Sequence, residues 1–311
     1  MNIMQIAKQG ITHPFGDERS VMQAFPSGIP SHQSDPFLMC DYFDAIESQG
    51  KATHEDDFPI AWHPHRGFDI ATYLKSGVGR HGDSLGNRET FSTPGIQWMS
   101  TGSGVEHAEG GGTEKGQRMQ GFQIWVNVKA ENKMDDPRYG TVPTNDLPLI
   151  EINQDVKARV LAGTTLGRKG PFETAQPVEM VDFELKMNAT VDYTVGEDLN
   201  TVMLYVYEGN LDDINGSGAL KTGSIVLMDA DSDEKRGLCL KTSSSSAGVM
   251  LFAGKKLKEP IAWHGPIVMN SQEQIWETFR DLRSGQFPPK RVSWDYRRLS
   301  SKPSSVANNE L

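Results

Sequence analysis

FDIATYLK, residues 68–75, is a short run rich in β-branched and aromatic side chains, and the turn residue Gly77 follows it. Such a run, bounded by turn residues, is typical of a β-strand. Similar runs recur in both halves of the chain, at 96–100, 104–109, 120–128, 158–162, 180–187, 200–208, 223–229 and 248–253. Stretches with helical periodicity are few. The pattern therefore predicts an all-β protein of antiparallel sheets or barrels.

The chain divides near its middle. Its 311 residues suit two domains, because single hydrophobic cores usually stop growing at roughly 250–300 residues. The segment KAENKMDDPRYGTVPTNDLP (129–148) is polar, contains three prolines and has no apolar periodicity, which is typical of a connection between domains. We expect domains at 1–145 and 146–290, followed by a polar tail at 291–311 whose last residues, 300–311, are mobile.

One helix is predicted near the C-terminus. Ser271 and Gln274 form a capping-box pattern, and Gly285 is a stop signal. Between them, an apolar stripe consists of Ile275, Trp276, Phe279 and Leu282. A helix with one apolar stripe is expected to pack on the outside of a barrel.

The overall charge and the cysteine content limit the functional classes. A formal net charge of −10 disfavours direct binding to nucleic acid. Two cysteines, far apart in the chain, fit a reducing intracellular compartment. Neither a signal peptide nor a run of 18 apolar residues is present, so we expect a cytoplasmic protein without a membrane span.

Two short motifs with the same spacing carry the candidate chemistry, His63-Pro64-His65 and His107-Ala108-Glu109. Side chains at positions i and i+2 of a strand point to the same face, so each motif presents two donor groups together. If the two strands are neighbours, three imidazoles and one carboxylate converge. That set suits one divalent first-row metal such as Fe, Mn, Ni, Co, Cu or Zn.

The alternative for each motif taken singly is a chance pair on a solvated strand. The remaining histidines of the first half lie in polar or turn-like sequence, so we expect His13, His32, His54 and His81 at the surface.

A longer series of motifs runs through the chain: HPHRGF (63–68), DSLGNR (83–88), PGIQWM (94–99), GSGVEHAE (102–109), GFQIWVN (121–127), PRY (137–139) and EPIAWHGPIVMN (259–270). In sequence and in order, this series resembles the pirin family of the cupin superfamily. The resemblance covers roughly residues 10–285. It implies two tandem cupin-type β-barrels, a bicupin, with the helix packed outside.

The resemblance also implies that the metal lies only in the N-terminal barrel, with His63, His65, His107 and Glu109 as ligands. The general cupin pattern places a glutamate four residues after HxH, and this chain has Asp69 there, which makes Asp69 a weak ligand candidate. The C-terminal half contains one histidine, His264, so it cannot assemble a second site of this type.

Members of the pirin family resemble quercetinases, which implies a metal-dependent dioxygenase of the quercetin 2,3-dioxygenase type, acting with O2 on an aromatic small molecule at Fe(II). Glu109 would then be both ligand and catalytic base. Arg66 is a candidate to orient an anionic substrate, with an ordinary salt bridge as the alternative. Aromatic candidates for the substrate pocket are Phe68, Trp98, Phe122 and Trp125, with core packing as the alternative for each.

The competing class is a non-enzymatic regulator that senses metal or redox state and binds a transcription factor or a metabolic enzyme. A purely structural metal is disfavoured, because structural sites usually close with four tetrahedral ligands. We expect a monomer, with a protein partner only in the regulator class.

Overall fold

The computed structural model describes residues 1–10, 13–15, 19–46, 54, 56–111, 114–230 and 236–303, with only the backbone at 13–15 and 19–20. The first half of the chain folds into two antiparallel sheets that form one barrel. The larger sheet contains, in spatial order, β12 (Arg138–Val142), β9 (Gly95–Ser100), β6 (Phe68–Ser76), β11 (Arg118–Asn127), β4 (Phe37–Ile46), β3 (Arg19–Phe25) and β2 (His13–Phe15). The smaller sheet contains β5 (Ile60–His65), β10 (Val105–Gly111), β7 (Val78–Asp83) and β8 (Arg88–Ser92).

The second half repeats this architecture. Its main sheet contains β1 (Asn2–Lys8), β22 (Ser224–Asp229), β19 (Thr201–Leu211), β24 (Ala247–Gly254), β17 (Val178–Leu185), β14 (Val156–Ala162) and β13 (Leu149–Asn153), and β21 (Leu220–Lys221) pairs with β19. A smaller sheet contains β18 (Thr190–Thr194), β23 (Gly237–Lys241) and β20 (Asp213–Ile214). Two hairpins complete the strands, β15 (Thr164–Thr165) with β16 (Arg168–Lys169) and β25 (Ala262–His264) with β26 (Ile267–Met269). The predicted strands are all present, and the all-β bicupin fold is confirmed.

Helices are few. They are α1 (Ser31–Ser34), α2 (Gln272–Ser284) and the 3₁₀ turns η1 (Ala130–Asn132) and η2 (Leu299–Ser301). Ser271 and Gln274 form the predicted capping box of α2, and Gly285 ends the helix in the left-handed conformation. Ile275 is buried and Phe279 packs beside it, whereas Trp276 is 57% exposed, so its place in the buried stripe was wrong. None of the described helices is long and apolar enough to span a membrane.

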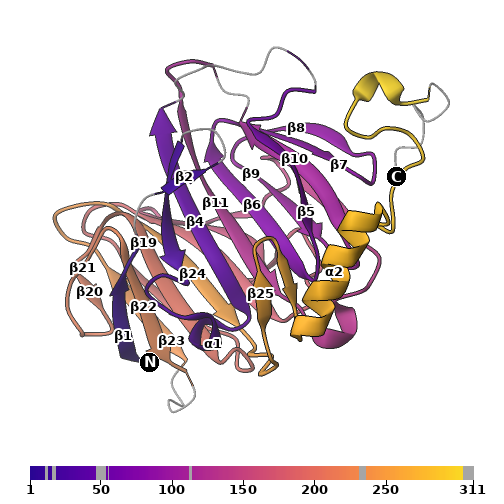
Figure 1. Ribbon diagram of the computed structural model, residues 1–311. Helices are drawn as coiled ribbons and strands as arrows, with labels where there is room; N and C mark the ends of the chain where they lie inside the picture. Colours follow the sequence, from indigo (N-terminus) through magenta and orange to yellow (C-terminus); the bar gives the residue numbers. More distant parts are fainter. Residues whose placement is uncertain are drawn as a thin grey trace.

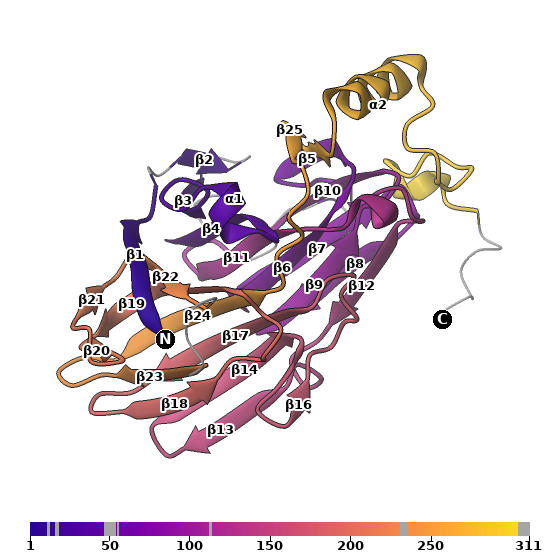
Figure 2. The ribbon, with the colours of Figure 1, turned by 90° about the horizontal axis from the view of Figure 1, so that it is seen from below.

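The two large sheets pack face to face, and the interface between the barrels is a hydrophobic core. Strands β4, β6 and β11 of the first barrel contribute aromatic side chains, as do β19 and β24 of the second. Phe25 and Phe37, for example, meet the Phe252 ring edge-on, with centroids 5.2 and 5.5 Å away. Figure 1 shows the two halves of the chain side by side, and Figure 2 shows their layers from below.

The two ends of the chain cross between the barrels. Strand β1 pairs with β22, so the N-terminus belongs to the sheet of the second barrel. Conversely, Arg66 forms a bridge with Ile267, which places the β25–β26 hairpin and α2 against the first barrel (Figure 1). The boundary near residue 145 stays a prediction, but the barrels do not consist of two simple halves of the chain.

The beginning of the expected tail is docked on the N-terminal barrel. Tyr296 donates a hydrogen bond from its hydroxyl to Glu106 and packs on Trp62, with ring centroids 5.4 Å apart. Leu299 donates its backbone N–H to Asp56 over 2.9 Å. Residues 304–311, most of the segment expected to be mobile, lie outside the described residues.

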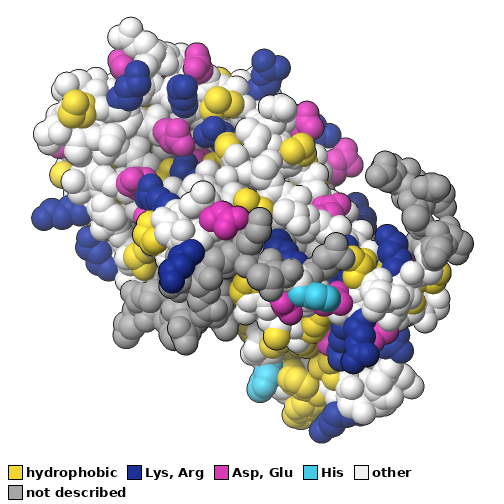
Figure 3. Space-filling model, turned by 90° about the horizontal axis from the view of Figure 1, so that it is seen from above, with side chains coloured by type: hydrophobic (Ala, Val, Ile, Leu, Met, Phe, Trp, Pro, Cys, Tyr) yellow, Lys and Arg dark blue, Asp and Glu magenta, His cyan; other side chains and the backbone are white. Residues whose placement is uncertain are grey.

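Acidic and basic side chains alternate on the face in Figure 3, where Lys and Arg stand among Asp and Glu. Among the side chains coloured on this face, Lys and Arg form no continuous stripe.

Candidate metal centre

Three histidines converge on the inner face of the N-terminal barrel. Strands β5 and β10 are antiparallel neighbours, and His107 lies directly opposite His63. Residues opposite each other project to the same face, and His65 is two positions along β5 from His63. One ring nitrogen from each of the three histidines lies within 4.8 Å of the others, and among the described residues this is the only cluster of that kind.

Backbone carbonyls fix the orientation of two of the rings. The Nδ1 of His63 lies 2.7 Å from the oxygen of Ala61, and the Nδ1 of His65 lies 3.2 Å from that of Pro266. A carbonyl oxygen can only accept, so each Nδ1 carries the proton and donates. The Nε2 of each ring therefore holds the lone pair that a metal requires.

The electrostatics favour neutral, ligating imidazoles. Burial and the neighbouring His63 hold the pKa of His65 and of His107 well below the usual range. Both rings are therefore neutral at neutral pH, with one N–H each, so no second ring proton has to be lost before a metal binds.

The donor atoms fit a metal ion. The Nε2 of His65 is buried without a hydrogen-bond partner in the described structure, and such an atom needs a ligand. The Nε2 atoms of His63 and His107 are 3.0 Å apart. Two ligands each about 2.1 Å from one ion subtend about 90° at that separation, as neighbouring ligands of an octahedral ion do.

Glu109 lies beside the three histidines, but its hydrogen bonds are to other residues. Its Oε1 is 4.0 Å from the Nε2 of His107, and it accepts hydrogen bonds from Gln123 over 2.9 Å and from Gln97 over 3.2 Å. A β-bulge between His107 and Glu109 shifts the register against β5. Glu109 is outside the tight cluster of three, so its service as a fourth ligand remains a prediction.

An apolar cavity begins at the carboxylate of Glu109. The cavity is small, about 30 Å³, and partly open to solvent. Its wall is mostly apolar and includes Phe43, Ile60, Leu74, Phe91 and Met119. The polar residues of the wall are Thr72, Arg80, Gln97 and Glu109. Glu109 therefore lies between the histidine nitrogens and a small space with a mostly apolar wall.

Two of the predicted pocket residues lie beside the histidines. The ring of Trp125 is 5.4 Å from His65, and Phe68 is 5.5 Å from it, measured between centroids. Phe68 and Trp125 also pack on each other at 4.4 Å. The Nε1 of Trp125 is buried with no hydrogen-bond partner among the described residues.

The other three predicted pocket residues are placed elsewhere. Trp98 and Phe122 belong to the core between the barrels, where Trp98 donates its Nε1 proton to Asp69 over 3.1 Å. Alternation along a strand separates its two faces. Here one face lines the barrel interior and the other packs against the second barrel, so both faces are apolar. Arg66 is 4% exposed and donates to Asp281 over 2.9 Å, so the salt-bridge alternative is correct.

Asp69 and the remaining histidines lie outside the cluster of three. Asp69 faces the second barrel through its bond to Trp98, and burial raises its pKa to about 6.

His32 and His54 are exposed as expected, and the side chain of His13 lies outside the described residues. The surface prediction for His81 was wrong, because its ring is 1% exposed and bonds to Asp83 over 3.0 Å. The i, i+2 spacing of His81 and Asp83 was a signal for an inward-facing pair.

These features define a bicupin whose N-terminal barrel carries a histidine cluster of the metal-binding type. The family model Pirin matches residues 18–126, and the model Pirin C-terminal cupin domain matches residues 180–288. The chain belongs to the pirin family.

Relatives agree over nearly the full length. A Pseudomonas aeruginosa protein, named provisionally as a quercetin 2,3-dioxygenase, is 37% identical over 88% of this chain and 94% of its own. A pirin-like protein of Caulobacter vibrioides is 35% identical over 88% of this chain and 95% of its own.

Solved structures share the architecture. The crystal structure of a quercetin 2,3-dioxygenase from Acinetobacter baumannii is similar with a TM-score of 0.84 and 27% identity, over 92% of this chain and 98% of its own. The bacterial pirin YhhW from Escherichia coli, solved in complex with nickel(II), matches with a TM-score of 0.59 and 21% identity, over 81% of this chain and 99% of its own.

Proposed function

We propose that this protein is a metal-dependent dioxygenase of the quercetin 2,3-dioxygenase type. The observation that carries the proposal is the position of Glu109 between the three histidine nitrogens and the apolar cavity. The cavity of about 30 Å³ is too small for a flavonol, so the apolar side chains around it would have to move apart before a planar aromatic substrate could bring a hydroxyl to Glu109 and to the metal together. The names of the Pseudomonas and Acinetobacter relatives support the same reaction class.

His63, His65 and His107 would hold the metal, most suitably Fe(II), and Glu109 would complete the set. The bound metal would supply a site at which a deprotonated flavonol and O2 are held in one complex. Three neutral imidazoles with one carboxylate leave positions open on a six-coordinate ion, which a closed structural site does not.

Glu109 performs the proton transfer in this proposal. The Glu109 carboxylate accepts the proton of the flavonol hydroxyl that reaches it from the cavity, which leaves the oxygen of the substrate anionic. Gln97 and Gln123 keep the carboxylate aimed, because each donates an amide hydrogen to one of its oxygens. The apolar wall excludes water from the deprotonated substrate.

The test is quercetin turnover by the full chain loaded with one metal at a time. We expect loss of flavonol absorbance in air with the Fe(II)-loaded protein, matched by O2 consumption, and no loss under argon. Separate preparations loaded with Mn, Ni, Co, Cu and Zn identify the metal that supports the reaction.

The regulator alternative gives a different result. A protein that binds one metal equivalent per chain but consumes no O2 with any of these metals is not a quercetinase. Metal binding without turnover would then support a metal-sensing partner of another protein.

A further inference from the structure

The three histidines differ in the group that contacts Nδ1, the ring nitrogen that would not bind the metal. His63 and His65 each donate Nδ1–H to a backbone carbonyl. The Nδ1 of His107 is buried and has no partner among the described residues. Histidines that bind metals almost always donate the second nitrogen to an oriented acceptor, which fixes the tautomer and the ring. His107 therefore lacks an assigned outer partner.

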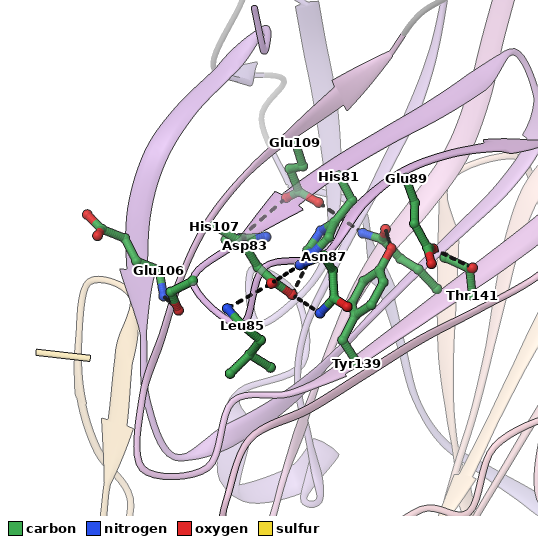
Figure 4. Close-up of polar contacts among 12 residues, drawn as sticks. His81, Asp83, Leu85, Asn87, Glu89, Glu106, His107, Glu109, Tyr139 and Thr141 are labelled. Atoms are coloured by element: carbon green, nitrogen blue, oxygen red, sulfur yellow. Dashed lines mark hydrogen bonds and ion pairs between the residues drawn. The ribbon is translucent and has the colours of Figure 1, made fainter. Parts of the chain in front are cut away.

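His81 and Asp83 lie beside this unassigned nitrogen. On the pair β7 and β10, His107 is directly opposite Asp83, and Glu109 is directly opposite His81. All four side chains therefore share the inner face of the barrel. Figure 4 shows them gathered on one side of the sheet, and the rings of His81 and His107 are 5.5 Å apart between centroids.

Asp83 fixes the tautomer of His81. Its carboxylate accepts backbone N–H groups from Leu85 and Asn87 over 2.9 and 3.0 Å, and the Asn87 amide over 2.7 Å. The Nε2 of His81 lies 3.0 Å from the same carboxylate, and a carboxylate held by three donors accepts from Nε2–H as a fourth. In neutral His81 the Nδ1 is then a lone-pair acceptor, and this atom is buried without a partner in the described structure.

Tyr139 prevents the His81 ring from turning away. The two rings stack in parallel, with centroids 4.0 Å apart and planes 10° apart. The hydroxyl of Tyr139 lies 3.2 Å from the Oε1 of Gln97, the same amide that donates to Glu109. The stack therefore connects His81, through Tyr139 and Gln97, to the hydrogen bonds that hold Glu109.

We propose that His81, oriented by Asp83, is the positioning residue of His107 and accepts its Nδ1–H when a metal binds to Nε2. Two ring radii and one hydrogen bond of about 3 Å span roughly 5.3 Å, so the rings are already near the required separation. The rotation that remains is that of the His107 ring about its terminal sp³–sp² torsion, which is soft. The inference rests on the proposed metal site, but it assigns a role to two residues outside it.

A pair of matched substitutions tests this role. His81→Gln keeps an amide donor near the Nε2 position for Asp83 but removes the acceptor at Nδ1. His81→Asn places an amide oxygen near the Nδ1 position but gives up Asp83. The purified full-length chain, stripped of metal, is titrated with Ni(II) in a calorimeter, and the thermal midpoint of each metal-free variant checks folding.

We expect Ni(II) affinity to fall about 10- to 100-fold in His81→Gln, as losses of outer partners typically do, and much less in His81→Asn. A merely structural pair would reverse the order, because the bond to Asp83 survives only in His81→Gln. Affinity in His81→Gln equal to wild type, or a loss no greater than in His81→Asn, overturns the proposal. No Ni(II) binding by the wild type would instead reject the metal site itself.

A second measurement does not depend on a folded variant. In the Zn(II)-loaded wild type, long-range ¹H–¹⁵N spectra of the imidazoles report the tautomers. We expect the proton on Nδ1 in His107 and on Nε2 alone in His81. A proton on the Nδ1 of neutral His81, or none on the Nδ1 of His107, contradicts the assignment.

Discussion

The two barrels share one architecture but differ in what their inner faces contain. The N-terminal barrel directs His63, His65, His107 and Glu109 inward and keeps a cavity next to them. The interior of the C-terminal barrel is a continuous cluster of buried apolar side chains, in which Phe183 is fully buried. A polar interior binds ligands at the expense of packing, whereas an apolar interior contributes stability. Within the described residues, the histidine cluster therefore lies in the first barrel, and the interior of the second barrel is mainly apolar packing.

Removing one ligand from the N-terminal barrel should have the largest effect on this difference between the barrels. His63→Ala should abolish metal copurification, because two histidines and a carboxylate leave the coordination shell incomplete. His63 is only partly buried, so folding should survive. Metal content per chain, measured by mass spectrometry with inductively coupled plasma, checks the result.

His264→Ala is the matched control for that variant. His264 is exposed and only packs edge-on against Phe279, with centroids 5.1 Å apart. Metal content should stay at the wild-type value. A reduced content would show that metal binding is not confined to the first barrel.

Glu109→Gln separates proton transfer from metal binding. The amide oxygen can still coordinate weakly, but it cannot accept a proton, so turnover should fall about 10²- to 10⁴-fold while part of the metal remains. Flavonol absorbance and metal content are measured on the same preparation. A loss of turnover only in proportion to lost metal would leave Glu109 as a ligand and nothing more.

Arg66→Ala tests how firmly the C-terminal helix is held on the first barrel. Arg66 donates to the carbonyl of Ser103 and to Thr278 and Asp281 on α2. Loss of these bonds to a buried guanidinium should lower the free energy of unfolding by about 2–3 kcal/mol. Urea denaturation measures the change. Arg280→Ala, which removes only an exposed pair with Glu277, should change it by less than about 0.5 kcal/mol.

Asp69→Asn should raise the free energy of unfolding at pH 7, by less than Arg66→Ala lowers it. Burial raises the pKa of Asp69 to about 6 from 3.8, so the folded protein binds the proton more tightly than the unfolded chain does. The stabilising contribution of the Asp69 proton is fully present below pH 3.8 and is lost as the pH rises through about 6. The amide avoids the buried charge and should add about 1–2 kcal/mol at pH 7. Unchanged metal content would confirm that Asp69 is no ligand, and unchanged stability at pH 7 would contradict the buried charge.

The local sequence predicted the histidine cluster because strand geometry makes i and i+2 neighbours. His63 and His107 needed only adjacent strands to meet. Trp98 and Phe122 follow the core-packing alternative. An apolar residue on a strand can face the barrel interior or the second barrel, and alternation does not distinguish the two.

Contacts between distant parts of the chain were beyond such reasoning. The carbonyl that orients His65 belongs to Pro266, 201 residues later, and no local pattern links them. Arg66 had a salt bridge as its stated alternative, but its partner on the C-terminal helix was not predictable. His81 was judged by the turn beside it rather than by its spacing from Asp83.

Because the C-terminal segment packs on the first barrel, the histidine cluster can reach its final geometry only late in synthesis. A ribosome releases His63, His65 and His107 early, and N-terminal domains generally fold first during synthesis. The acceptor for His65 emerges only with residue 266, and β26 joins Arg66 at the same stage. The nascent N-terminal barrel therefore lacks the acceptor that orients His65, and the histidine cluster reaches the described geometry only after residue 266 has been synthesised.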